Sequence, residues 1–135
     1  MIFVDTTIWA SDIDSSDTLH EDGAAVLEAL ASGQLSSAIT TDFVLDETLT
    51  LLKTRGGKAE SIVEAIQNII SSHRVSILYV DETLFRAALS TYKKYERLSF
   101  TDAVTLRVMR QRKIKEVFSH DSDFDLKAIL RKERP

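Results

Sequence analysis

The residues Ile2-Phe3-Val4-Asp5-Thr6-Thr7 place three apolar side chains directly before a carboxylate. The length of this run and its β-propensity predict a short buried strand that ends at Asp5. The segment Glu116-Val-Phe-Ser119 has the same form and leads into a second acid, Asp121. Between these two segments, helical apolar stripes alternate with short strands. This alternation predicts an α/β fold in which helices cover both faces of a parallel sheet.

The expected elements follow from the spacing of apolar residues and from local start and stop signals. Strands are expected over 2–5, 37–40, 75–80 and 116–119, with a further short strand around 128–130. Helices are expected over 18–33, from Thr41 to the Gly56-Gly57 pair, over 58–72, over 81–95 and from Ser99 onward. Thr41, Asp81 and Ser99 are the expected N-caps, because their side chains can accept a hydrogen bond from the first helical turn.

Length and composition indicate a single domain over residues 1–135. The chain is 44% hydrophobic and 28% charged, as is usual for a globular protein with its own core. It has no Cys, which excludes disulfides and thiolate metal sites. We find no secretory leader pattern and no apolar run of the roughly 18 residues that a membrane span needs, so we expect a cytoplasmic protein.

The net charge of −4 argues against a simple nucleic-acid coat, but the charges are unevenly distributed. Residues 107–134 carry nine Lys or Arg against five Asp or Glu. Arg107 and Arg110 are three residues apart and share a helical face, so we predict that they flank the active cleft and contact phosphates. Arg112 and Lys113 are expected at the helix end. The alternative is a solvated basic face that binds nothing.

The carboxyl ends of parallel strands meet at one edge of a sheet, where such folds bind ligands. Asp5 and Asp121 both follow strands, so we expect them at this edge. Asp102 stands in the first turn of the helix that begins at Ser99, and Glu47 lies among apolar residues within its helix. A buried carboxylate needs a partner, which favours a functional site. The alternative is that Asp5 and Asp102 only cap or stabilise helix starts.

Three acids at alternate positions follow the last clear strand: Asp121, Asp123 and Asp125. Their charges raise one another's pKa, so holding them together favours a bound cation. An EF-hand loop is excluded, because Leu126 stands where glycine is needed and Lys132 where glutamate is needed. A surface turn rich in Asp is the alternative.

Several other kinds of site are excluded or disfavoured. The chain has no glycine-rich nucleotide loop of the P-loop or dinucleotide type. Its three histidines lack the spacing of a zinc site. Trp9 is interpreted as a packing residue. Tyr92 and Tyr95, beside Lys93-Lys94, could contact nucleic acid, but an ordinary helix surface is the simpler interpretation.

Four segments together resemble the acidic motifs of the PIN-domain nucleases. They are Val4-Asp5-Thr6-Thr7, Val44-Leu-Asp-Glu47-Thr-Leu49, Leu98-Ser-Phe-Thr-Asp102-Ala and Val117-Phe-Ser-His-Asp121-Ser-Asp-Phe124. Each motif is weak alone, but all four occur in the family's order and cover essentially the whole chain. The resemblance implies a Rossmann-like fold with four or five parallel strands. It also implies a Mg²⁺- or Mn²⁺-dependent endoribonuclease, often the VapC-type toxin of a toxin–antitoxin pair and often a homodimer.

Carried over residue by residue, the resemblance assigns the four catalytic acids to Asp5, Glu47, Asp102 and Asp121. Three of these, Asp5, Asp102 and Asp121, would bind the metal. Asp123 or Asp125 would assist Asp121, and the sequence does not decide between them. The hydroxyls of Thr7 and Ser119 would support the acids.

Two other functions compete with an RNA-cutting enzyme. A haloacid-dehalogenase-like phosphohydrolase would use Asp5 as its nucleophile, but it needs a second acid where this chain has Thr7. A non-catalytic PIN-like binding module would keep the acids only as helix caps. The acids should form one cluster if they are catalytic and scatter if they are caps. We further predict that the helices over 41–72, rich in Ile and Leu, form a homodimer interface or bind an antitoxin.

Overall fold

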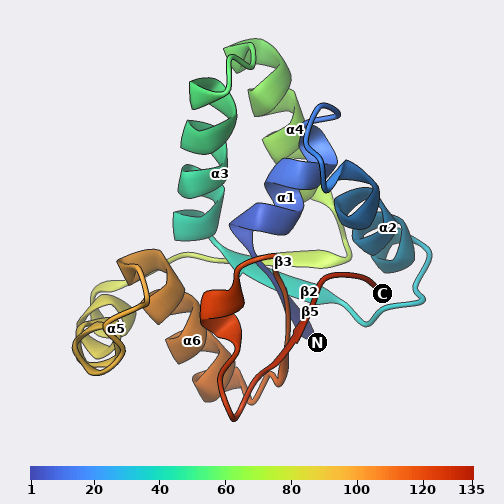
Figure 1. Cartoon of the computed structure of the whole chain (residues 1–135). Coiled ribbons are helices and arrows are strands. Elements are labelled where there is room, and N and C mark those ends of the chain that lie inside the picture. The colour runs from blue at the N-terminus through green and yellow to red at the C-terminus, as the bar shows by residue number, and fades with distance from the viewer.

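The computed structural model describes all residues, 1–135, as a five-stranded sheet with six α-helices and one 3-10 turn (Figure 1). The strands are β1 (Ile2–Val4), β2 (Ala38–Thr41), β3 (Val75–Leu78), β4 (Glu116–Phe118) and β5 (Leu130–Lys132). The helices are α1 (Thr6–Ile13), α2 (His20–Ala31), α3 (Asp42–Thr54), α4 (Ala59–Ser71), α5 (Glu82–Lys94) and α6 (Phe100–Arg112). The 3-10 turn η1 (Ser122–Phe124) follows β4.

The sheet has the strand order β3-β2-β1-β4-β5, and every neighbouring pair is parallel. Figure 1 shows α1 to α4 gathered on one side of the sheet and α5 with α6 on the other. This confirms the predicted α/β fold. From β1 the chain adds β2 and β3 on one side of the sheet and then β4 and β5 on the other side. The crevice beyond the carboxyl ends of β1 and β4, where the order switches sides, is where this kind of sheet accommodates a ligand.

The main core lies around the two central strands. Phe3 and Val4 of β1 and Phe118 of β4 are fully buried in a cluster of 19 apolar residues. Trp9 is also fully buried, and its indole N–H donates to the carbonyl oxygen of Val4 at 3.2 Å. The structure therefore confirms the interpretation of Trp9 as a packing residue.

The three predicted N-caps are confirmed. Thr41 Oγ1 accepts a hydrogen bond from the Val44 N–H, and the Asp81 carboxylate and Ser99 hydroxyl do the same for α5 and α6. The short strand expected around 128–130 forms two residues later, as β5. Helix α1 was not predicted, because its first turn is rich in β-branched and aromatic residues, which have low intrinsic helix propensity. Burial of Ile8 and Trp9 against the sheet stabilises it instead.

Part of the apolar surplus over residues 41–72 is buried within the monomer. A second core cluster joins α1, α3 and α4, and contains Ala10, Leu45, Leu52, Ile62 and Ile66. On α4, Val63 and Ile70 remain close to half exposed. No helix of the chain is both long enough and apolar enough to cross a membrane.

Candidate active site

The four predicted catalytic acids converge at the carboxyl edge of the central strands. Asp5 directly follows β1, Asp121 follows β4, Asp102 lies in the first turn of α6 and Glu47 projects from α3. Burial, above all, and then the negative charge of Asp5 contribute to raising the pKa of Asp102 to about 7. Asp121 and Glu47 raise the same pKa through their charges. The four carboxylates therefore interact electrostatically, although they come from four separate parts of the sequence.

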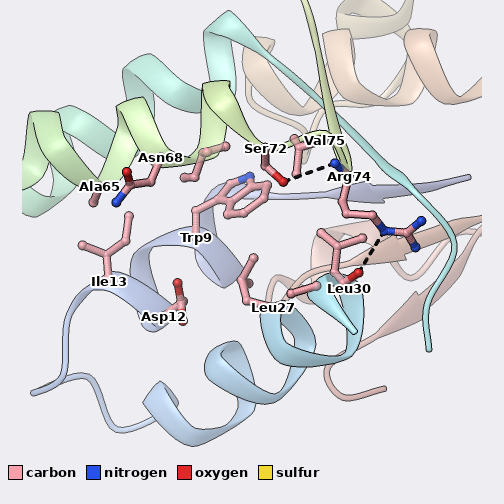
Figure 2. A pocket seen from close by; sticks show the side chains of 12 residues that line it. Trp9, Asp12, Ile13, Leu27, Leu30, Ala65, Asn68, Ser72, Arg74 and Val75 are labelled. Atoms are coloured by element: carbon pink, nitrogen blue, oxygen red, sulfur yellow. Dashed lines mark hydrogen bonds between the residues drawn. The ribbon is translucent and has the colours of Figure 1, made fainter. Parts of the chain in front are cut away.

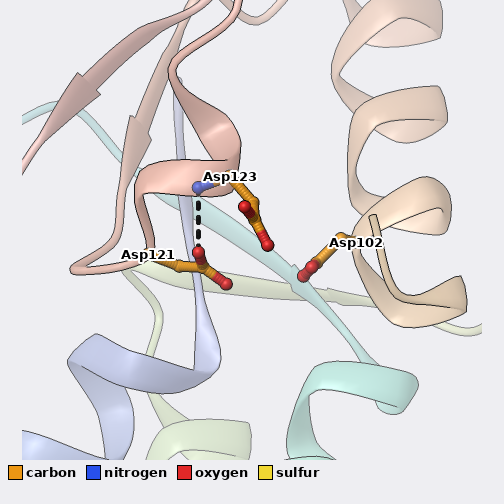
Figure 3. Close-up of side chains that lie close together, drawn as sticks. All are labelled: Asp102, Asp121 and Asp123. Carbon is orange, nitrogen blue, oxygen red and sulfur yellow. Dashed lines mark hydrogen bonds between the residues drawn. The ribbon is translucent and has the colours of Figure 1, made fainter. Parts of the chain in front are cut away.

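A fifth acid joins this group through the 3-10 turn. Carboxylate oxygens of Asp102, Asp121 and Asp123 lie within 4.8 Å of one another. Figure 3 shows the Asp102 and Asp123 side chains pointing toward each other, with Asp121 beside them. The Asp121 carboxylate accepts a hydrogen bond from the Asp123 N–H at 2.9 Å, which holds the turn against the end of β4. Three oxygen ligands are thus arranged around one small space.

Two hydroxyl groups hold the Asp5 carboxylate. Its Oδ2 accepts hydrogen bonds from Ser119 Oγ at 2.7 Å and from Thr7 Oγ1 at 3.1 Å. The same hydroxyls accept from the backbone of the loop after β4, Thr7 from His120 N–H and Ser119 from Asp121 N–H. The structure therefore brings both predicted supporting hydroxyls onto Asp5, and they tie the end of β1 to the loop that carries Asp121.

The acid cluster, defined as Asp5, Glu47, Asp102, Asp121 and Asp123, contains no balancing cation from the chain. All seven ion pairs of the protein involve other carboxylates. Burial raises the pKa of Asp5 more than its hydroxyl partners lower it. Asp5 and Asp102 are buried and the other three acids are partly buried. Grouped carboxylates of this kind are unfavourable without a counter-charge, so the cluster has the electrostatics of a cation-binding site.

The sequence model of the PIN-domain family matches residues 2–130. A VapC ribonuclease of Archaeoglobus fulgidus is 34% identical over 131 residues, which is 95% of this chain and 81% of the relative. The chain belongs to the PIN-domain family.

Further relatives place this PIN domain beside the VapC proteins. The 23S rRNA-specific endonuclease VapC20 of Mycobacterium tuberculosis is 32% identical over 126 residues, 92% of each chain. The crystal structure of VapC20, described as a Sarcin-Ricin loop cleaving toxin, superposes with a TM-score of 0.81 over 96% of this chain and 97% of that one, at 30% identity. A toxin–antitoxin complex from Klebsiella pneumoniae has a TM-score of 0.67 at 14% identity, with 96% of each chain covered, and shares the fold.

The structure separates the two candidate assistants of Asp121 in this PIN domain. Asp123 joins the acid cluster, whereas Asp125 is exposed and bonded to Arg131 at 2.7 Å. The hydrogen bonds from Arg131 hold the pKa of the Asp125 carboxyl below its ordinary range. Arg131 also donates to the backbone carbonyl of Ser119, so Asp125 anchors β5 to the loop after β4. The sequence could not distinguish the two acids, because their local patterns are alike.

The two arginines predicted to contact RNA lie further along α6. Arg110 is eight residues beyond Asp102, or about 12 Å along the helix axis. It is exposed and donates to the Tyr95 hydroxyl at 2.6 Å, with its guanidinium 5.4 Å from the ring centroid. Arg107 is half-buried, and its buried Nε has no hydrogen-bond partner. Neither arginine takes part in any of the seven ion pairs of the chain.

A pocket of about 310 Å³ lies between α1, α2, α4 and β3, away from the acid cluster (Figure 2). Eight of its twelve lining residues are hydrophobic, among them Trp9, Leu27 and Ile69. Arg74 closes one side, where its Nε donates to the Leu30 carbonyl oxygen at 3.1 Å. None of the five clustered acids lines this pocket. It is suited to apolar side chains rather than to catalysis.

Proposed function

We propose that this PIN domain is a divalent-metal-dependent endoribonuclease that acts as the toxin of a toxin–antitoxin pair. The observation that carries the proposal is the acid cluster, in which five carboxylates from four parts of the sequence meet without a cation from the chain. The names of its relatives, a VapC ribonuclease and a 23S rRNA-specific endonuclease, support RNA as the substrate. An enzyme that cuts cellular RNA would work in the cytoplasm.

The donor set of the acid cluster fits Mg²⁺ or Mn²⁺. Every nearby donor is an oxygen, from carboxylates or hydroxyls, and hard divalent cations prefer oxygen ligands. Asp102, Asp121 and Asp123 would hold the cation, together with Asp5. A bound cation of this kind supplies a nucleophile at neutral pH and offsets charge on the phosphate.

The chain's own residues would prepare this chemistry in three ways. Ser119 and Thr7 hold the Asp5 carboxylate in one orientation by hydrogen bonds. Burial and the neighbouring acids raise the pKa of Asp102 to about 7, so this carboxyl binds a proton more readily than an ordinary aspartate and would lose it on serving as a metal ligand. Glu47 approaches from α3 and adds a further negative charge beside Asp5 and Asp102.

The competing functions explain less of the geometry. The hypothesis that Asp5 and Asp102 serve only as helix caps does not fit the structure. The Asp5 side chain makes no cap hydrogen bond to α1, and the cap of α6 is Ser99 rather than Asp102. Of the five clustered acids, only Asp121 caps a turn with its side chain. A phosphohydrolase of the haloacid-dehalogenase type needs an acid at position 7, where the Thr7 hydroxyl donates to Asp5 instead.

Cleavage of labelled RNA in Mg²⁺, Mn²⁺ and excess chelator tests the proposal. We expect cleavage at internal positions of the RNA that requires the metal. The first substrate to test is a fragment that carries the 23S rRNA Sarcin-Ricin loop. Glu47→Gln should lose most activity, whereas Asp46→Asn, an exposed neighbour on the same helix, is the matched control and should retain it. Cleavage that persists in excess chelator would contradict the metal requirement, and no cleavage of any RNA would contradict the enzyme.

We also propose that an antitoxin binds across α4. The half-exposed Val63 and Ile70, and the apolar pocket beside α4, supply surface for a partner. The toxin–antitoxin complex from Klebsiella pneumoniae, which shares the fold, supports this kind of partner. A homodimer that uses the same helices is the alternative. Light scattering of the protein alone and with its co-expressed antitoxin distinguishes antitoxin binding from a homodimer. If the antitoxin binds across α4, Ile70→Glu should abolish the complex and leave the mass of the free protein unchanged.

A further inference from the structure

A cleft of about 420 Å³ adjoins the acid cluster on the side of α5 and the loop before α6. Three cationic residues line one wall: Lys93, Lys94 and Arg97. Asp123 and Leu126 line the other wall, so Asp123 belongs both to the acid cluster and to this cleft. We call this site the cationic cleft. It is continuous with the proposed catalytic site through a shared side chain.

The cationic side chains of the cleft form no ion pair within the protein, although Arg97 helps to lower the pKa of the Asp125 carboxyl. Lys93, Lys94 and Arg97 take part in none of the chain's seven ion pairs, and Glu96, which also lines the cleft, pairs with no cation. The chain as a whole has a net charge of −4, so acids to pair with are plentiful. Grouped cations with their charge left free attract an anion from solution.

Tyr95 connects the cleft to Arg110 at the far end of α6. The ammonium of Lys94 and the guanidinium of Arg110 each lie 5.4 Å from the centroid of the Tyr95 ring. The Tyr95 hydroxyl accepts a hydrogen bond from Arg110 at 2.6 Å. These contacts restrict both long cationic side chains, which lowers the entropy lost when they bind an anion. Arg110 therefore contributes to a prepared cationic surface.

We infer that the cationic cleft binds backbone phosphates of the RNA strand on one side of the bond that is cut. This inference rests on the proposed ribonuclease function. A strand whose reactive phosphate lies at the acid cluster can continue directly into the cleft, because Asp123 belongs to both. The acids without metal repel RNA, so attraction has to come from a neighbouring cationic surface.

Salt-dependent RNA binding with Ca²⁺ in place of Mg²⁺ tests the assignment. Lys94→Ala combined with Arg97→Ala should flatten the slope of log K against log salt by about 1.4, which is roughly 0.7 for each phosphate of a single strand that is no longer neutralised. The same relation makes RNA binding roughly tenfold weaker at about 0.15 M salt and nearly unchanged at about 1 M. Lys94→Arg combined with Arg97→Lys keeps both charges and should keep the slope.

The matched control removes two other exposed cations that form no ion pair, Lys53 and Lys58, at the turn between α3 and α4. Lys53→Ala with Lys58→Ala changes the net charge equally and should leave the slope as in the wild type. An equal loss of affinity in both double variants would overturn the cleft assignment, because it would reflect overall charge alone. A loss that persists at about 1 M salt, where phosphate contacts contribute little, would overturn it too, because it would indicate a structural defect.

Failure of this inference can be told apart from failure of the proposed function. If the wild type cuts no RNA, the ribonuclease proposal fails. If the wild type cuts RNA and the Lys94→Ala, Arg97→Ala variant has an unchanged KM and slope, only the cleft assignment fails. Inorganic phosphate serves as a competitor. If millimolar phosphate displaces RNA from the wild type but not from this variant, RNA and phosphate compete for the cleft cations, which supports the assignment. If phosphate binds the wild type but not the variant and leaves RNA bound, the cleft is a small-anion site and the RNA assignment is overturned.

Discussion

Replacing Asp102 by Asn should make the metal-free protein more stable while it removes activity. The pKa of Asp102 is about 7 in the folded chain, against an ordinary value of 3.8, because burial and the neighbouring acids disfavour its charge. The folded chain therefore binds a proton at this carboxyl more tightly than the unfolded chain does. This tighter proton binding contributes to the free energy of unfolding. The contribution is fully present below pH 3.8 and is lost as the pH rises through 7. Asn keeps the shape of the side chain and never acquires the unfavourable charge.

The difference between the two pKa values sets an upper limit on the effect. About three pKa units at 1.36 kcal/mol each correspond to about 4 kcal/mol above pH 7. The Asp102 carboxylate faces Asp123, which is only partly buried, as is Asp121, so solvent screens part of the repulsion between these acids. We therefore expect Asp102→Asn to raise the free energy of unfolding by about 2 kcal/mol at pH 8 and by much less at pH 5.

Urea unfolding in excess chelator at pH 5 and pH 8 measures this effect. The wild type should lose stability between pH 5 and pH 8, and the Asp102→Asn variant should lose less, with Asp46→Asn as the exposed control. Added Mn²⁺ should stabilise the wild type more than the variant, because a ligand that binds only the folded state raises its stability. A wild type whose stability does not change with pH, or a variant that is no more stable at pH 8, would refute the reasoning.

Three further predictions concern single side chains. Asp123→Asn should lower the rate of RNA cleavage on the order of 100-fold or more, since loss of even an outer-shell group costs 10–100-fold. Asp125→Asn should change the cleavage rate little, and equal losses in the two variants would contradict the different roles of the two acids. Ser119→Ala removes a hydrogen bond to the buried Asp5 carboxylate, and should lower both the cleavage rate and, by about 2 kcal/mol, the free energy of unfolding in the presence of metal. Gly23→Ala should destabilise the fold by at least about 2 kcal/mol in urea unfolding, because its Cβ would lie 2.2 Å from the Ser11 hydroxyl oxygen; a fully stable variant would show that α1 and α2 can move apart.

The sequence by itself determined the layout of the fold and four members of the acid cluster. Alternating strands and helices require a parallel sheet, and the carboxyl ends of parallel strands share an edge, so acids directly after two strands had to approach each other. The N-caps Thr41, Asp81 and Ser99 were predictable for a similar reason. Cap hydrogen bonds are local, and residues three apart determine them.

Tertiary structure decided what neighbouring residues could not. Helix α1 forms against its local propensity, because Ile8 and Trp9 gain more from burial than the backbone loses. Asp123 and Asp125 have the same chemistry two residues apart, and the ion pair of Asp125 with Arg131 on β5 separates them. The cationic cleft joins the end of α5 and the loop after it, residues 93–98, to the turn after β4, where Asp123 and Leu126 lie. Its contacts depend on how the two segments pack, and no local pattern encodes that packing.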